Sequence, residues 1–299
     1  MEGKPRHAWP ARVIGICLVL SLACSSSAQN QNLKTPAKTA CLWLSVVDPL
    51  NRQLIGLPKG SFRVFEDGIE QTITNFRANP EDVPISLGVI WDVSRSRNGG
   101  ENYEGARALV SRLLRARLPE AEYFLINFSE SAPIQQVAGK MPATDVQIDT
   151  SQKRIALFDA IDVGLARIRQ STLDRRAIII ISDGEETYSK HTASEIRKNA
   201  QESDVRIYGI MSPGPFTDAI RDVAGATGGR LYAPNNFLEL GYYVDLALTE
   251  FRSQYQLCYT PTNSNHDGTW RKIAIKLNPP PKLPKLTVYA RKERFVPKD

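Results

Sequence analysis

The sequence predicts an α/β fold, in which a doubly wound and mostly parallel Rossmann-like sheet is inserted into a small β-sandwich. Between residues 82 and 252, strand-like apolar runs alternate with helical stretches, which is typical of parallel strands with helices on both faces. Residues 29–80 and 253–299 contain only strand-like runs, and neither flank has enough of them to be stable alone. We therefore expect the two flanks to pair with each other in one β-sandwich.

Residues 1–28 have the features of a bacterial signal peptide. Basic residues precede an apolar run at 13–23 that is too short to span a bilayer, and small residues follow at 26–28. An alternative is a lipid anchor at Cys24, but Leu22 stands one position too late for a good lipobox. No later run is long and apolar enough to span a membrane. We expect an exported protein that is periplasmic, at the cell surface or secreted.

The N-terminal flank begins with a polar leader at 29–38 and continues with three strand-like runs. These runs lie at 41–47, 62–65 and 71–76. Asp67-Gly68 separates the last two, and this dipeptide is typical of a two-residue hairpin turn.

The central region, 82–252, contains four strand-like runs and five helical stretches. The strands are expected at 85–91, 123–128, 177–182 and 205–210, and the helices at 103–117, 154–170, 193–202, 217–225 and 237–252. In the second helix, Leu157, Ile161, Leu165 and Ile168 recur at the three-to-four spacing of an amphipathic helix. Ligands of such folds bind at the carboxyl ends of the strands.

The C-terminal flank contains strand-like runs at 256–259, 270–277 and 286–290. Outside the signal peptide, Cys41 and Cys258 are the remaining cysteines, one in each flank. In an exported chain they could form a disulfide that links the flanks across the insertion. Two buried free thiols are the alternative.

The formal charge of +6 includes a net charge of +2 from the signal peptide, so the mature chain carries about +4. Its basic residues are scattered and form no stripe with interleaved aromatic residues, which argues against binding to nucleic acid. Solubility explains a charge of this size.

Oxygen-bearing side chains follow two of the apolar strands. Asp92, Ser94 and Ser96 follow the strand at 85–91, and Asp183 ends the strand at 177–182. Carboxylate and hydroxyl oxygens suit Mg²⁺ or Mn²⁺, with Ca²⁺ as a further possibility, rather than zinc or copper. The sequence thus predicts one divalent-cation site. The alternative is a set of ordinary turn and capping residues.

These residues resemble the von Willebrand factor A (VWFA) domain. The resemblance rests on the strand followed by Asp92-x-Ser94-x-Ser96, on the helix at 156–160 (Ala-Leu-Phe-Asp-Ala) and on Ile181-Ser182-Asp183-Gly184. The flanking segments at 56–68 and 255–261 resemble those of an exported VWFA-related group common in Acidobacteria. Altogether the resemblance covers about residues 40–295.

The resemblance implies a metal-ion-dependent adhesion site formed by Asp92, Ser94, Ser96 and Asp183. In such a site the neutral serine hydroxyls leave the cation enough charge to capture an Asp or Glu carboxylate of a partner protein. Where the family has a threonine, this chain has Ile155, so the metal could be lost unless Thr150 or Ser151 replaces that oxygen. Arg95 and Arg97 would also repel a cation, although Glu185 and Glu186 could offset them. Asp159 is expected to support the site without binding the metal.

Enzymatic function has little support in the sequence. Outside the signal peptide the histidines are His191 and His266, and no nucleophile elbow or nucleotide-binding glycine motif is present. A haloacid-dehalogenase-type phosphatase needs a second aspartate where Ser94 stands. We therefore predict a non-enzymatic binding protein. The alternatives are a metal-free VWFA scaffold in an envelope complex and, less well supported, a metal-dependent hydrolase with Asp92 as nucleophile.

Overall fold

The computed structural model describes residues 39–78, 83–94, 113, 121–132, 134–137, 154–211, 214–235 and 239–298. The signal peptide predicted at 1–28 lies outside these ranges, and so does the helix predicted at 103–117 apart from Leu113. Within the described ranges, every helix is too short or too polar to cross a bilayer.

A six-stranded sheet forms the centre of the α/β part, in the order β10-β9-β8-β5-β6-β7. Five of these strands are parallel, and β7 runs antiparallel to β6. The strands are β5 (Ile85–Asp92), β6 (Glu122–Phe128), β7 (Ile134–Val137), β8 (Arg175–Ser182), β9 (Arg206–Met211) and β10 (Leu231–Tyr232). The mostly parallel α/β sheet predicted from the sequence is therefore confirmed.

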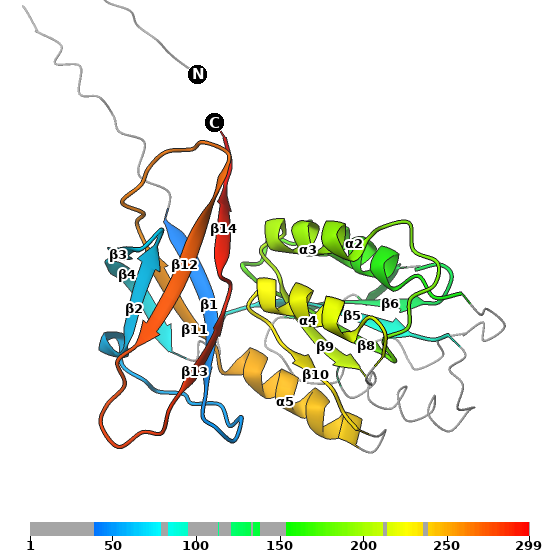
Figure 1. Ribbon diagram of the computed structural model, residues 1–299, viewed down its shortest axis with the longest axis horizontal. Helices are drawn as coiled ribbons and strands as arrows, with labels where there is room; N and C mark the ends of the chain where they lie inside the picture. Colours follow the sequence, from blue (N-terminus) through cyan, green and yellow to red (C-terminus); the bar gives the residue numbers. More distant parts are fainter. Residues whose placement is uncertain are drawn as a thin grey trace, which may run out of the picture. The chain divides into compact units, whose positions relative to one another are not determined.

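Helices cover both faces of this sheet, with α2, α3 and α4 on one face and α5 on the other (Figure 1). The helices are α2 (Leu157–Ile168), α3 (Ala193–Glu202), α4 (Thr217–Ala226) and α5 (Leu240–Arg252). Along β8, Ile178 and Ile180 belong to the core on the α2 side, whereas Ile179 and Ile181 belong to the core on the α5 side. Because the strand is buried on both faces, its sequence is uninterruptedly apolar from Ala177 to Ile181.

Two four-stranded antiparallel sheets contain the strands of the flanks, in the orders β13-β1-β11-β4 and β14-β12-β2-β3. The N-terminal strands are β1 (Ala40–Val47), β2 (Phe62–Glu66), β3 (Ile69–Gln71) and β4 (Ile73–Ala78), with the short helical turn η1 (Lys59–Ser61) before β2. The C-terminal strands are β11 (Tyr255–Tyr259), β12 (Thr269–Leu277), β13 (Thr287–Ala290) and β14 (Glu293–Val296). The sequence patterns did not reveal β14.

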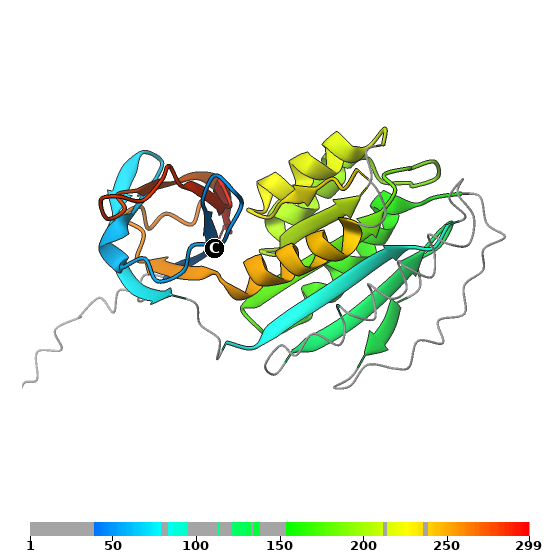
Figure 2. The same cartoon turned by 90° about the horizontal axis from the view of Figure 1, so that it is seen from below.

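Strands from the two ends of the chain alternate in the sheet β13-β1-β11-β4, and in the other sheet β12 from the C-terminal flank pairs with β2 from the N-terminal flank. Figure 2 shows the blue-to-cyan ribbons of one flank beside the orange-to-red ribbons of the other. Side chains from both sheets share one apolar core, which includes Leu44 and Tyr255 from the first sheet and Val64 and Ile273 from the second. Cys41 and Cys258 are directly opposite each other on β1 and β11, and their sulfur atoms form a disulfide. This bond joins the first strand of one flank to the first strand of the other.

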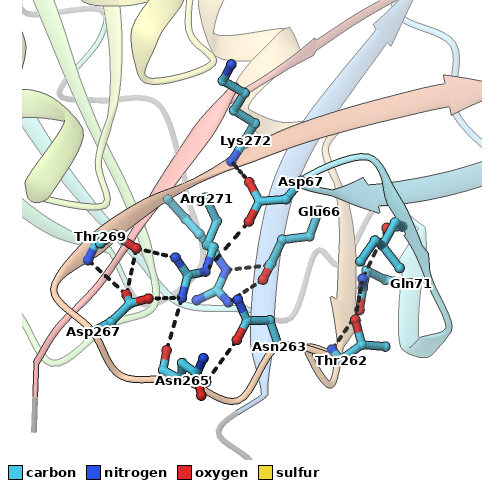
Figure 3. A network of polar contacts seen from close by, with 12 residues as sticks. Glu66, Asp67, Gln71, Thr262, Asn263, Asn265, Asp267, Thr269, Arg271 and Lys272 are labelled. Atoms are coloured by element: carbon cyan, nitrogen blue, oxygen red, sulfur yellow. Dashed lines mark hydrogen bonds and ion pairs between the residues drawn. The ribbon is translucent and has the colours of Figure 1, made fainter.

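The predicted hairpin at Asp67-Gly68 is confirmed. These two residues connect β2 to β3 and have φ angles of 49° and 83°, the left-handed values that a two-residue hairpin turn needs. A polar network fixes this turn to the loop before β12 (Figure 3). Arg271 forms ion pairs with Asp67 and Asp267, and Lys272 N donates to Asp67 Oδ1 at 2.8 Å. Arg271 is therefore the cation that holds this end of the flank sheets together.

Candidate metal and partner site

The candidate site lies where β5 and β8 end side by side. The two strands are parallel neighbours, and their register pairs Trp91 with Ile181. The next residues along the strands, Asp92 and Ser182, therefore project from the same edge of the sheet, and Asp183 follows directly. Parallel strands bring their carboxyl ends to one edge, which is why two carboxylates far apart in the sequence lie close together here.

Hydroxyl groups surround the Asp92 carboxylate. Ser94 donates to Asp92 Oδ1 through its backbone N at 2.9 Å and its Oγ at 2.6 Å. Ser182 Oγ donates to Asp92 Oδ2 at 2.8 Å. Both carboxylate oxygens of Asp92 thus accept hydrogen bonds from serine hydroxyls, one from each strand end.

The electrostatics of Asp92 favour a nearby cation. Burial of the carboxyl group, followed by repulsion from Asp183, raises the pKa of Asp92 to about 6, although the hydrogen bonds from Ser94 and Ser182 act in the opposite direction. Two carboxylates that repel each other in a partly dry site are stabilised by a bound cation. Asp183 itself accepts a hydrogen bond from Glu185 N on Oδ1 at 3.1 Å.

The donor set of the described residues fits a hard divalent cation but is poor in charge. Two carboxylates and two hydroxyls are oxygen ligands of the kind that Mg²⁺ and Mn²⁺ accept, with water completing the coordination. In the described ranges there is no group of three or more His, Cys, Asp and Glu residues that could hold a metal. The fit therefore depends on hydroxyl ligands. Ser96, Arg95, Arg97, Thr150 and Ser151 lie outside the described residues.

Ile155 offers no oxygen from its side chain, which is buried. Its backbone instead joins the loop before α2 to the loop after β8. Ile155 N donates to Thr187 Oγ1 at 3.0 Å, and Ile155 O accepts hydrogen bonds from Thr187 N and Tyr188 N at 2.9 and 3.0 Å. The position at which the resemblance expects a threonine is thus occupied by a packing residue, and a hydroxyl from a different loop lies beside it.

The contacts of several residues at this edge of the sheet could not be foreseen from the sequence. Ser182 contacts Asp92, and its signal was the register of two adjacent strands, each ending in a polar residue. Glu186 and Ser189 bond the first turn of α2, through Glu186 Oε2 to Phe158 N and Ser189 Oγ to Asp159 N, both at 3.1 Å. Because Glu186 bonds the start of α2, Glu185 is the neighbouring acidic residue that is left to offset the charges of Arg95 and Arg97.

Among the described residues, the hydrogen bonds of Asp159 lead to the loop after β8 and not to Asp92. Its carboxylate accepts hydrogen bonds from Lys190 N and His191 N, and lies 2.8 Å from His191 Nδ1. Tyr188 is exposed, with the Arg154 guanidinium 4.5 Å from its ring centre. The loop that follows Asp183 is therefore fastened to the start of α2 along its length.

Comparison with solved structures shows what this arrangement resembles. Proximal thread matrix protein 1 from the mussel byssus matches with a TM-score of 0.51 and 13% identity, over 62% of this chain and 49% of that chain. A structure of the same protein with a zinc-occupied MIDAS motif matches with a TM-score of 0.50 over the same shares. The ArnB paralog VWA2 from Sulfolobus acidocaldarius has a TM-score of 0.44 and 15% identity, over 88% of this chain and 76% of that chain.

This chain spans about half the length of the mussel protein. No protein-family model and no curated protein matches it. At these identities the likeness concerns the fold alone, and it agrees with the sheet order and the helices described above. The α/β part of the chain therefore has the fold of a von Willebrand factor A domain.

Proposed function

We propose that this protein is a non-enzymatic binding protein that captures a partner protein through a divalent cation held by Asp92, Ser94, Ser96 and Asp183. The observation that carries this proposal is the convergence of Ser94 and Ser182 hydroxyls on the Asp92 carboxylate, next to Asp183. A bound Mg²⁺ or Mn²⁺ would supply positive charge and an open position for an Asp or Glu carboxylate of the partner.

The role of the protein side chains follows from their charge. Serine hydroxyls bind a cation without neutralising it, so a site with only two carboxylates retains attraction for a third from outside. Ser182 orients Asp92 by bonding the oxygen that Ser94 does not use. The Thr187–Ile155 bonds hold the neighbouring loop in place without contributing a ligand.

The proposal that the protein is not an enzyme is supported by the surroundings of His191. His191 Nδ1 faces Asp159 at 2.8 Å, and Nε2 lies 3.9 Å from Asp162 Oδ2. Both ring nitrogens thus face carboxylates rather than a hydroxyl or thiol nucleophile. A screen with phosphatase and esterase substrates tests the hydrolase alternative, and turnover that disappears in Asp92→Asn would replace the present proposal.

A metal-free scaffold is the second candidate, and Ile155 is the observation that favours it. With isoleucine in place of threonine the site has one oxygen ligand fewer. Ser96 and water would then have to complete the coordination of the metal. In this alternative, partners would bind to the surface around Tyr188 or elsewhere by packing alone.

The cellular setting and the domain organisation belong to the same proposal. Export through residues 1–28 would place the protein in the periplasm, at the cell surface or outside the cell. There the Cys41–Cys258 bond would persist. We propose that 29–80 and 253–299 form one β-sandwich and that 82–252 is a domain inserted into it. The shared core and the strand pairing of the flanks support this organisation.

Metal titration separates the first two candidates. Purified protein is treated with EDTA and titrated with Mg²⁺, Mn²⁺, Ca²⁺ or Zn²⁺ by calorimetry, and its melting temperature is followed in parallel. Saturating metal is expected to stabilise the folded state by about 1–3 kcal/mol through ligand linkage. Asp92→Asn should abolish the effect. Asp218→Asn, which changes an exposed carboxylate on α4, should leave it intact. Equal behaviour of the wild type and Asp92→Asn would favour the scaffold.

A further inference from the structure

A small pocket with four arginines among its lining residues lies away from Asp92 and Asp183, between strands of the flanks and strands of the α/β part. Its volume is about 20 Å³, and its lining includes Trp43, Arg175, Arg176, Asp204, Arg206 and Arg291. A volume of this size holds about one water-sized atom or group. The pocket is therefore too small for an organic ligand but large enough for a single ion.

The charge around this pocket is unbalanced. Four guanidinium groups line it, with Asp204 as the one carboxylate among the lining residues. Asp204 is already paired with Arg291 Nη1. Burial, with a contribution from the nearby charge of Arg206, lowers the pKa of Arg175 to about 10, although Tyr208 acts in the opposite direction. Arginine keeps its proton even so, which means that these cations remain charged in close proximity.

Arg206 illustrates the imbalance best, because the oxygens that accept its hydrogen bonds among the described residues are all uncharged. Its side chain is 5% exposed. Nη1 donates to Ser45 Oγ at 2.8 Å, and Nη2 donates to Trp43 O and Tyr289 O at 3.2 and 2.6 Å. These bonds orient the guanidinium but do not neutralise it. A buried charge without a counter-charge is costly, and a bound anion would remove that cost.

Two hydrogen-bond donors in this pocket are unused. The Nε–H groups of Arg206 and Arg291 are buried and have no hydrogen-bond partner among the described residues. Both side chains line the same pocket. Unpaired buried donors of this kind indicate a missing acceptor, and beside several positive charges the acceptor that fits best is negatively charged.

We propose that this pocket binds one small inorganic anion, which accepts hydrogen bonds from the Nε–H groups of Arg206 and Arg291. The anion is either chloride or an oxyanion such as phosphate that inserts one of its oxygen atoms into the pocket. Each of these presents one compact, negatively charged acceptor. It would be bound by Arg206 at the start of β9 and by Arg291 after β13, and would thereby fasten the flank strands to the α/β sheet. This site is independent of the proposed metal site and of any partner protein.

The test uses chloride and phosphate as probes of the purified full chain. Chloride binding is followed by the line width of the ³⁵Cl NMR signal, and the melting temperature is measured at each salt concentration. Wild-type protein should broaden the signal saturably and melt at a higher temperature as chloride rises. Displacement of chloride by millimolar phosphate would identify an oxyanion site, and broadening that phosphate does not reverse would identify a chloride site.

Arg291→Gln should reduce the affinity for the anion at least tenfold, because it removes both a donor and a charge. Arg221→Gln is the matched control, since it changes the same residue type at an exposed position on α4. If Arg291→Gln fails to fold, Arg176→Gln is the second variant. Arg176 lines the pocket and its Nε donates to Leu173 O. Loss of its charge is expected to lower the affinity for the anion several-fold. Equal chloride broadening and equal salt dependence in wild type, Arg291→Gln and Arg176→Gln would overturn the proposal. General salt effects would appear in Arg221→Gln as well.

Discussion

Two aspartates of the α/β part show how the surroundings of one side chain set its charge. Burial and the proximity of Asp183 raise the pKa of Asp92. Burial also acts to raise the pKa of Asp159, but the hydrogen bonds from His191 and Lys190 outweigh it and lower that pKa. Asp159 is therefore stable as an anion next to an imidazole, whereas Asp92 favours an added cation. That Asp159 supports the site without binding the metal stays a prediction.

The His191–Asp159 pair predicts a specific dependence of stability on pH. The hydrogen bond with Asp159, joined by the charges of Asp162, Asp159 and Glu195, raises the pKa of His191, although burial acts to lower it. A raised pKa in the folded state means that the stabilisation is complete below the unfolded-state pKa of about 6.5 and is lost as pH rises through the folded-state value. The loss begins above about pH 6.5.

Denaturant unfolding at pH 5.5 and pH 8.5 measures this effect, with His191→Gln as the comparison. The wild type should lose more stability between the two pH values than the variant does. NMR titration of the His191 ring should give a pKa above that of an unperturbed histidine. A His191 pKa below 6.5 would contradict the assigned pairing with Asp159.

Helix α2 illustrates how an element can depend on a distant loop. Its N-cap residue is Ala156, which has no polar side chain to bond the free N–H groups of the first turn. Glu186 and Ser189 supply the acceptors from the loop after β8. A carboxylate at a helix N-terminus also interacts favourably with the helix dipole. The loop beside the candidate metal site is thus rigidly coupled to α2.

Replacement of this cap should measurably weaken the domain. Glu186→Ala is expected to lower the free energy of unfolding by about 1–2 kcal/mol, since the N–H of Phe158 loses its acceptor. Glu185→Ala changes the adjacent acidic residue and should stay within about 0.5 kcal/mol of wild type. Both are compared in EDTA by urea unfolding, so that metal binding plays no part. Equal losses in the two variants would refute the capping role.

The connection from α4 to β10 contains a glycine that no other residue can replace. A Cβ at Gly229 would lie 1.9 Å from the carbonyl oxygen of Ile207 on β9. At Gly225, inside α4, a Cβ would meet nothing within 4 Å. The two glycines stand four residues apart in the sequence but under opposite steric constraints.

Alanine substitutions should therefore have opposite effects at these two positions. Gly229→Ala is expected to destabilise the protein by at least about 2 kcal/mol, because backbone must move to admit the methyl group. Gly225→Ala is expected to stabilise it by about 0.5–1 kcal/mol through helix propensity. Thermal and urea unfolding of the two variants tests both signs. Stabilisation by Gly229→Ala would show that β9 and this loop are farther apart than described.

At the scale of the whole molecule, a disulfide joins the N-terminal and C-terminal flanks. The disulfide between Cys41 and Cys258 closes a loop with a sequence separation of 217 residues. Arginines of the α/β part add further bonds to the flank strands. Arg206 bonds backbone oxygens of Trp43 and Tyr289, and Arg230 bonds Asn51 Oδ1 at 2.8 Å. The two flanks are therefore joined to each other by a disulfide and to the α/β part by hydrogen bonds from its arginines.

Removal of the disulfide should destabilise the protein globally. The double variant Cys41→Ser, Cys258→Ser is expected to lose about 2–4 kcal/mol of unfolding free energy, since the unfolded chain regains the entropy of a long open loop. Wild-type protein treated with a thiol reductant is the matched comparison and should behave in the same way. Alkylation of Cys41 and Cys258 in unreduced, denatured wild-type protein would show that the bond is not formed.

Much of the fold was predictable because it depends on local patterns. The uninterrupted apolar run in β8, the three-to-four spacing of apolar residues in α2 and the Asp67-Gly68 turn each specify an element within a few residues. Asp92 was a candidate ligand for the same reason, since a carboxylate directly after a buried parallel strand belongs to the ligand-binding edge of the sheet. Such signals are complete within one segment of the chain.

The sequence alone predicted most of the strands and helices in their order, although not β7, β10 and β14, and it placed Asp92 and Asp183 at strand ends and one cysteine in each flank. Tertiary structure decided that Ser182 bonds Asp92, that Glu186 caps α2, and that Arg206 and Arg291 line one pocket. These contacts join residues from about 28 to 90 positions apart. They depend on strand register and loop path, which no local pattern of residues specifies.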